Sequence, residues 1–220
     1  MAISKLNFNS INVTPTASKG IGFDSGADDL EATFSGGSMN FIKKLTASSD
    51  STLSFVDGSS SVVFDSTYKE YLFIFNNIHP SADAAIFLFN GSDEDSSHSY
   101  DVTKSTTSFY AYQTENGTAQ SLTYDANQDL AQSTDFQRLG TSIGNDNDQA
   151  LSGYLRIFNP SSTTFAKHFL AETHISSHEN LALHFFFAGY FNDTDDVTSI
   201  QFKMDSGNID SGTISLYGIS

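Results

Sequence analysis

The chain has 220 residues, of which 26 are acidic and 10 are basic, so its formal net charge is −16. This charge repels phosphate groups and anionic lipids, so we expect neither nucleic acid nor a membrane among its partners. The sequence contains no Cys, which excludes disulfides and thiolate metal sites, and its twenty Phe and nine Tyr are the material for a packed core.

Residues 1–40 differ from the rest of the chain. Their apolar residues are spaced too widely for a helix, and Pro15 and several Gly interrupt the segment. We predict an extended N-terminal arm with one short turn at Asp28–Ala32. Such an arm buries its side chains on a neighbouring domain or subunit rather than on itself. A disordered tail is the alternative. The predicted partner-binding residues are Leu6, Phe8, Ile11, Val13, Ile21 and Phe23.

From Met39 onward, apolar and polar residues alternate with period two, which is typical of half-buried strands. Turn sequences such as Asp57-Gly58 and Asn90-Gly91 separate the apolar runs. Many short strands at this spacing predict an all-β fold, an antiparallel, jelly-roll-like β-sandwich over residues 41–220. The predicted strands are Met39–Thr46, Thr52–Val56, Ser61–Phe64, Glu70–Asn77, Ala84–Asn90, Ser105–Tyr112, Leu151–Asn159, Ala166–Thr173, Leu181–Phe191, Ile200–Met204 and Thr213–Ile219.

Two of these strands are apolar on both faces, namely Tyr71–Phe75 and Leu183–Phe191, the latter apart from His184. We therefore expect part of the sheet to be covered on both sides, by another sheet, the arm or a partner. The region Gly117–Ala150 has the weakest periodicity, and we predict a surface insertion with one helical turn there.

Three patterns suggest chemistry, and we assign none of them a catalytic or metal-binding role. Gly140–Gly144 matches the G-x-S-x-G motif, but it lacks the strand and helix that this motif requires, so we interpret it as a loop. His174 and His178 have the spacing of a zinc motif without its glutamate, and the segment is predicted as strand and turn rather than helix. Exposed or core histidines are the preferred interpretation, and zinc is the alternative.

Acidic loops offer oxygen ligands of the kind that Ca²⁺ prefers, but none completes a calcium-binding loop motif. Our interpretation is charge that faces solvent, with no metal ligand; calcium is the alternative. The residues concerned are Asp93, Glu94, Asp95, Asp146, Asp148, Asp193, Asp195 and Asp196.

Several longer stretches carry a resemblance to a known group of proteins: Lys5–Ser10, Thr14-Pro15, Phe23–Ser25, Tyr71–Pro80, Gly153–Thr164, Gln201–Ile209 and Gly212–Ile219. With these stretches the chain resembles a recurring type of virion protein of tailed bacteriophages, in particular marine phages. The resemblance implies a structural component, either a capsid decoration (cement) protein or part of a tail fibre. Fibre-like members carry a long repetitive N-terminal segment, whereas this chain has a short one.

We therefore expect a non-enzymatic capsid decoration protein with no cofactor, made in the host cytoplasm and located on the surface of the phage particle. Its expected partners are the major capsid protein or other virion proteins and further copies of itself, with a trimer among the candidate oligomers. The alternative function is a tail-fibre or receptor- or carbohydrate-binding domain, which would use Tyr100, Tyr110, Tyr112 and Tyr124. A depolymerase is a third hypothesis, which the lack of a carboxylate pair disfavours.

Overall fold

The computed structural model describes residues 20–23, 30–34 and 38–220. The chain divides into two compact units, residues 1–40 and residues 41–220. In the first unit, β1 (Gly20–Phe23) pairs antiparallel with β2 (Leu30–Phe34). Leu30, Glu31 and Ala32 therefore lie in a strand, and the predicted turn is wrong over these residues.

Residues 41–220 form two antiparallel sheets packed as a sandwich, which confirms the predicted all-β fold class. No helix occurs in the part of the chain that the structure describes. The larger sheet has the order β3 (Met39–Thr46), β14 (Ile209–Ile219), β5 (Glu70–Pro80), β10 (Leu151–Phe158), β11 (Lys167–Ser176), β12 (Leu181–Phe191), β7 (Lys104–Thr114) and β8 (Gln120–Tyr124). The smaller sheet has the order β4 (Thr52–Val56), β13 (Ser199–Met204), β6 (Ala85–Ser92) and β9 (Gln137–Ile143).

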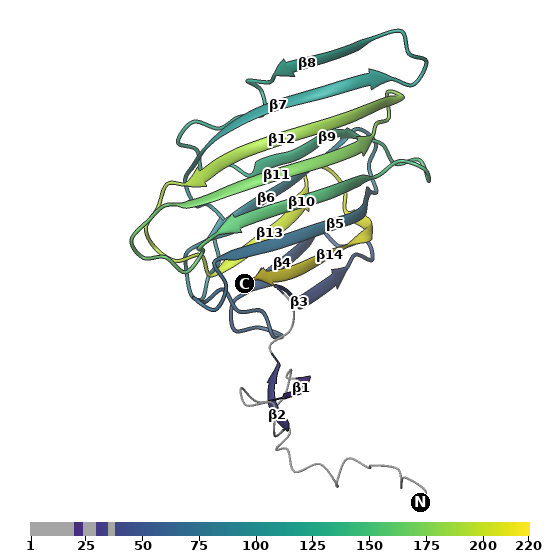
Figure 1. The fold of residues 1–220 in the computed structure, drawn as a ribbon. Helices are drawn as coiled ribbons and strands as arrows, with labels where there is room; N and C mark the ends of the chain where they lie inside the picture. Colours follow the sequence, from purple (N-terminus) through teal and green to yellow (C-terminus); the bar gives the residue numbers. More distant parts are fainter. Residues whose placement is uncertain (1–19, 24–29, 35–37) are drawn as a thin grey trace, which may run out of the picture. The chain divides into compact units, whose positions relative to one another are not determined.

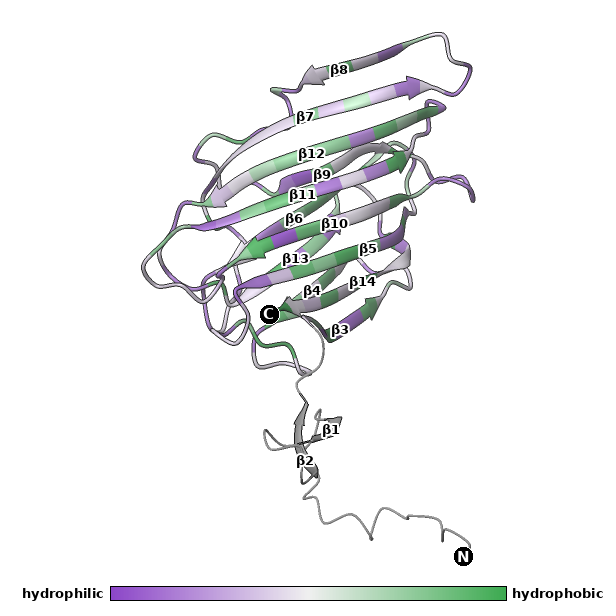
Figure 2. Ribbon diagram, viewed as in Figure 1, coloured by the Kyte–Doolittle hydropathy of each residue, from purple (hydrophilic) through white to green (hydrophobic). Residues whose placement is uncertain are grey.

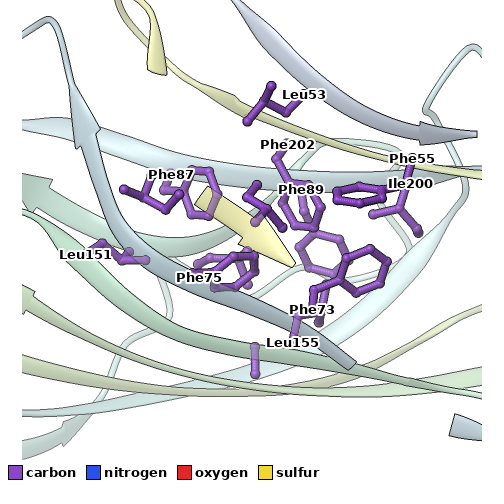
Figure 3. Close-up of a cluster of buried hydrophobic side chains, with 14 of the residues drawn as sticks. Leu53, Phe55, Phe73, Phe75, Phe87, Phe89, Leu151, Leu155, Ile200 and Phe202 are labelled. Atoms are coloured by element: carbon purple, nitrogen blue, oxygen red, sulfur yellow. The ribbon is translucent and has the colours of Figure 1, made fainter. Parts of the chain in front are cut away.

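The core lies between the two sheets, and Phe is the most frequent of its buried apolar residues in the described part of the chain. Figure 2 shows apolar and polar residues along the strands of the larger sheet, and on the central strands β5, β10, β11 and β12 the buried positions alternate and carry mostly apolar side chains. Figure 3 shows rings from β5, β6, β4 and β13 gathered in one cluster. Its members include Phe55, Phe73, Phe75, Phe87, Phe89 and Phe202, all of which are buried.

The sequence patterns locate most strands. Every predicted strand except Ser61–Phe64 coincides with an observed strand, and the bounds of β3, β4 and β12 agree to the residue. Ser61–Phe64 lies in the loop between β4 and β5, where Val62 and Phe64 are buried without forming a strand. The ring of Phe64 packs edge-on against Tyr71, with 5.3 Å between the centroids, so this loop closes one end of the core.

The prediction for Gly117–Ala150 is wrong. These residues, all of which the structure describes, contain β8 and β9 and no helical turn. β8 is an exposed edge strand of the larger sheet, whereas β9 is an edge strand of the smaller sheet with Leu139 and Ile143 fully buried. The region is thus partly an extension of one sheet and partly core.

Candidate functional site

The residues predicted to bind a partner cannot be placed as a site. Leu6, Phe8, Ile11 and Val13 lie outside the described residues. Ile21 and Phe23 belong to β1, within the two-stranded sheet of the first unit. Their role in docking stays a prediction.

The outer face of the larger sheet carries large apolar side chains. Figure 1 shows the smaller sheet on the other side of this layer. Leu170 of β11 is 47% exposed, Phe109 of β7 is 44% exposed and Leu122 of β8 is 70% exposed. Phe41 and Tyr124 are also exposed and lie on the same face. We call the side chains Phe41, Phe109, Leu122, Tyr124 and Leu170 the exposed sheet face.

The strand register brings aromatic and polar residues together on this face. Tyr154, Glu172, Phe186 and Phe109 are successive cross-strand partners on β10, β11, β12 and β7. The rings of Phe186 and Phe109 stack with 4.7 Å between their centroids. Beside this row, the small side chain of Ala188 leaves two hollows of about 320 Å³ and about 220 Å³, and Leu170 lines both.

A hydrogen-bonded network occupies the middle of the same face. The Tyr154 hydroxyl donates to Glu172 Oε2 at 2.7 Å, and His184 Nε2 lies 2.8 Å from Glu172 Oε1. The hydrogen bond from Tyr154 is the largest cause of a lowered pKa at Glu172, and burial lowers the pKa of His174. A carboxylate that stays ionised and has hydrogen-bond partners at both oxygens is suited to fix the neighbouring side chains rather than to act as a general acid.

The four clustered histidines have separate environments. The rings of His174 and His184 meet edge-on at 6.0 Å on neighbouring strands. His178 Nδ1 lies 3.2 Å from the Ser142 carbonyl oxygen, and His168 lies beside the ring of Tyr190. His174 and His178 therefore do not share the helical face that a zinc site would need, because β11 ends at Ser176 between them.

Three acidic loop residues converge at one end of the sandwich. One carboxylate oxygen from each of Asp93, Asp193 and Asp195 lies within 4.8 Å of the others, and no other such group occurs in the described part of the chain. The buried ammonium of Lys167 donates to the backbone carbonyls of Asp193, at 3.1 Å, and Asp195. Burial is the largest cause of a raised pKa at Asp93. Calcium binding by these loops stays an alternative, and Lys167 already supplies a positive charge beside them.

Two buried lysines are functional candidates that the sequence reasoning missed. Lys104 and Lys167 both pair in register with Phe191, one on each neighbouring strand. Lys104 Nζ donates to the carbonyl oxygens of Val102, at 3.0 Å, and Asp135, at 2.5 Å. Each lysine thus fixes loop backbone at the same end of the sandwich. Nothing in the polar sequences around them signals this role.

The structure brings together only two of the four tyrosines predicted for a recognition site. Tyr110 and Tyr112 stack on the inner face of β7, with 6.3 Å between their ring centroids. Tyr124 lies on the opposite face and donates to Asp129. Tyr100 lines a separate hollow together with Arg138.

The G-x-S-x-G sequence does not form a nucleophile elbow. Its first four residues belong to β9, and a loop follows instead of a helix. Ser142 has a φ of 61°, and its carbonyl oxygen accepts a hydrogen bond from the His178 backbone at 3.2 Å. The strand-to-helix turn that would activate this serine is therefore missing.

Comparison with protein families, curated proteins and solved structures finds no match to this chain. No helix in the described residues is long and apolar enough to cross a membrane.

Proposed function

We propose that this chain is a non-enzymatic virion structural protein, specifically a capsid decoration protein that stabilises a phage head. The strand order supports this proposal. Eight strands lie in the orders β3-β14-β5-β10 and β4-β13-β6-β9, which is the order expected for a jelly roll. Jelly rolls occur in viral capsid proteins and in lectins, so the fold fits both the proposal and its alternative.

The exposed sheet face is the observation that carries the proposal. The larger sheet has four additional strands, β11, β12, β7 and β8, which have no counterpart in the smaller sheet. Several side chains on its outer face are large, apolar and exposed. Large apolar side chains that are exposed on one face of a sheet mark a candidate interaction surface. Three polar side chains of this face bond to one another, since Glu172 accepts a hydrogen bond from Tyr154 and lies within hydrogen-bond distance of His184. A surface of this kind is suited to binding another protein rather than to catalysis.

The proposed mechanism is attachment by burial of apolar surface. The exposed sheet face docks on the major capsid protein, and residues 1–40 supply a second contact. Each large side chain that becomes fully buried contributes about 1.5–3 kcal/mol before the cost of ordering. Repetition of this contact over a symmetric shell strengthens the whole particle.

The first test is electron microscopy of intact phage particles with a gold-labelled antibody against this chain. Label spread over the head is the expected result. Label confined to the tail would instead support the alternative, a tail-fibre or receptor-binding domain. Absence of label from the particle would overturn the virion assignment.

A second test addresses the docking surface. Leu170→Asp and Phe109→Asp place a charge on the exposed sheet face, and we expect each to lower binding to undecorated heads at least tenfold. Phe165→Asp is the matched control, because Phe165 is 70% exposed in the loop before β11 and does not belong to this face. Equal binding by all three variants would exclude the exposed sheet face as the docking surface.

A further inference from the structure

A groove distinct from the exposed sheet face lies on the other side of β7 and β12. It has a volume of about 430 Å³, and its lining includes Tyr110, Tyr112, Asp125, Gln128, Ser142 and Glu179. In Figure 1, β7 and β8 lie at the end of the larger sheet, past the strands of the smaller sheet. The loop that follows β8 brings Asp125 and Gln128 to this groove.

Aromatic rings form one wall of the groove. Tyr110 stacks on Tyr112 at an interplanar angle of 27° and packs on the buried Phe185, with 5.3 Å between the centroids. Burial raises the pKa of Tyr110 above its usual value, and the protonated hydroxyl of a tyrosine can donate a hydrogen bond. Rings held in this way offer an apolar surface with a polar edge.

Hydrogen-bond acceptors also line the groove. Gln128 is only 5% exposed, and its Nε2 donates to Asp125 Oδ2 at 2.6 Å. Its other polar atom, Oε1, is buried without a hydrogen-bond partner among the described residues. Leaving a buried acceptor unsatisfied costs about 1–3 kcal/mol, so a donor that reaches this atom, from a bound molecule or from water, is favoured.

The chemistry of the lining defines the ligand. No Lys or Arg lines the groove, whereas the carboxylates of Asp125 and Glu179 do, and the chain carries a net charge of −16. Anionic ligands are therefore disfavoured. A sugar ring has an apolar C–H face that packs on tyrosine and hydroxyl groups that donate to carboxylate and amide oxygens.

We propose that this groove binds a neutral carbohydrate, with Tyr110 and Tyr112 packing against a sugar face and Asp125 and Gln128 accepting hydrogen bonds from its hydroxyls. The proposal does not depend on capsid decoration. A decoration protein with such a groove would give the particle a means to adhere to a glycan-bearing surface.

The test uses the full chain on an array of neutral, sialylated and sulfated glycans, followed by calorimetry with the neutral oligosaccharide that binds best. We expect binding to neutral glycans, and a loss of affinity of at least tenfold in Tyr112→Ala. Tyr124→Ala is the matched control, because this tyrosine lies on the adjacent strand but on the opposite face, and we expect its affinity to stay within twofold.

Gln128→Met provides a second variant that keeps the size of the side chain and removes both the unpartnered oxygen and the hydrogen bond to Asp125. Thermal unfolding of each variant establishes that it is folded. A loss of affinity in a folded Gln128→Met protein supports the proposal. Binding to no glycan, a preference for sialylated or sulfated glycans, or unchanged affinity in both Tyr112→Ala and Gln128→Met would each overturn it.

Discussion

At the scale of single residues, Phe202 is the centre of the core. Its ring contacts those of Phe55, Phe73, Phe75, Phe87 and Phe89, with centroids 5.3–6.4 Å apart. These partners come from β4, β5 and β6, so one side chain on β13 joins both sheets. Most of the contacts are edge-to-face, the arrangement that aromatic pairs favour.

We predict that Phe202→Ala lowers the free energy of unfolding by about 3–5 kcal/mol, because it removes a large buried ring and leaves a cavity. Urea denaturation measures this change. Phe165→Ala is the control, since its side chain is 70% exposed, and we expect it to lie within about 0.5 kcal/mol of the wild type. Similar losses in the two variants would contradict this account of the core.

Lys104 makes a pH-dependent contribution that opposes folding. Burial lowers its pKa to about 8 from the usual 10.5. Between these two values the unfolded chain binds more protons than the folded chain, so stability rises as the pH increases from about 8 to about 10.5. Between pH 7.5 and pH 10 this gain is about 2 kcal/mol.

We predict that Lys104→Met abolishes this gain, because methionine does not titrate. Urea denaturation at both pH values gives the change in the free energy of unfolding for the wild type and for the variant. Subtracting one change from the other removes the contribution of the groups that titrate in both proteins. If the two proteins show the same pH dependence, Lys104 is not the group responsible.

At the scale of structural elements, the loop between β4 and β5 closes one end of the sandwich through its contact with β14. The ring of Tyr68 lies where a side chain on Gly218 would be, since a Cβ there would come within 2.1 Å of the ring. Phe64 and Tyr68 both pack on Tyr71. The loop therefore belongs to the core although it has no regular structure.

We predict that Gly218→Ala destabilises the protein by about 1–3 kcal/mol, because the added methyl group displaces Tyr68. A double-mutant cycle with Tyr68→Ala tests the cause. We expect the cost of Gly218→Ala to be much smaller when Tyr68 has already been removed. Additive costs would show that the strain arises elsewhere.

The same elements show why the sequence predicts most of the fold and misses part of it. β3 and β4 have alternating apolar and polar residues and β12 is a nearly continuous apolar run, and the bounds of all three were predicted correctly. β9 was missed because Gln137 and Gly140 occupy buried positions of the strand. A Cβ at Gly140 would lie 2.6 Å from both Ile175 and Leu151, so long-range packing selects glycine here. Ser61–Phe64 was predicted as a strand because a loop that buries Val62 and Phe64 has the same alternation.

The candidate site was less accessible to sequence reasoning. Tyr110 and Tyr112 were expected in a recognition site, and their spacing by two residues is what places both on one face of a strand. The partners that complete the groove come from distant segments, namely Asp125 and Gln128 after β8 and Glu179 between β11 and β12. Only the paired register of the sheet brings these segments together.

At the scale of the whole molecule, residues 41–220 have their own core and form a compact unit separate from residues 1–40. We predict that a truncated chain beginning at Met39, which keeps β3 intact, unfolds cooperatively within about 3 °C of the full chain. Differential scanning calorimetry measures this. Under the proposed function, the truncated chain should also bind phage heads more weakly than the full chain does. Loss of cooperative unfolding would show that the sandwich depends on the first unit.

The position of β14 has a consequence for the way the protein is made. This strand, residues 209–219, lies between β3 and β5 in the larger sheet. The ribosome synthesises β3 and β5 long before β14. The strand that pairs with both of them is therefore missing during most of translation. Contacts of such long sequence separation form slowly. Under the proposed function, a docking surface that requires the complete sheet therefore forms only after β14 has been made, so attachment to a particle would follow the folding of the whole sandwich.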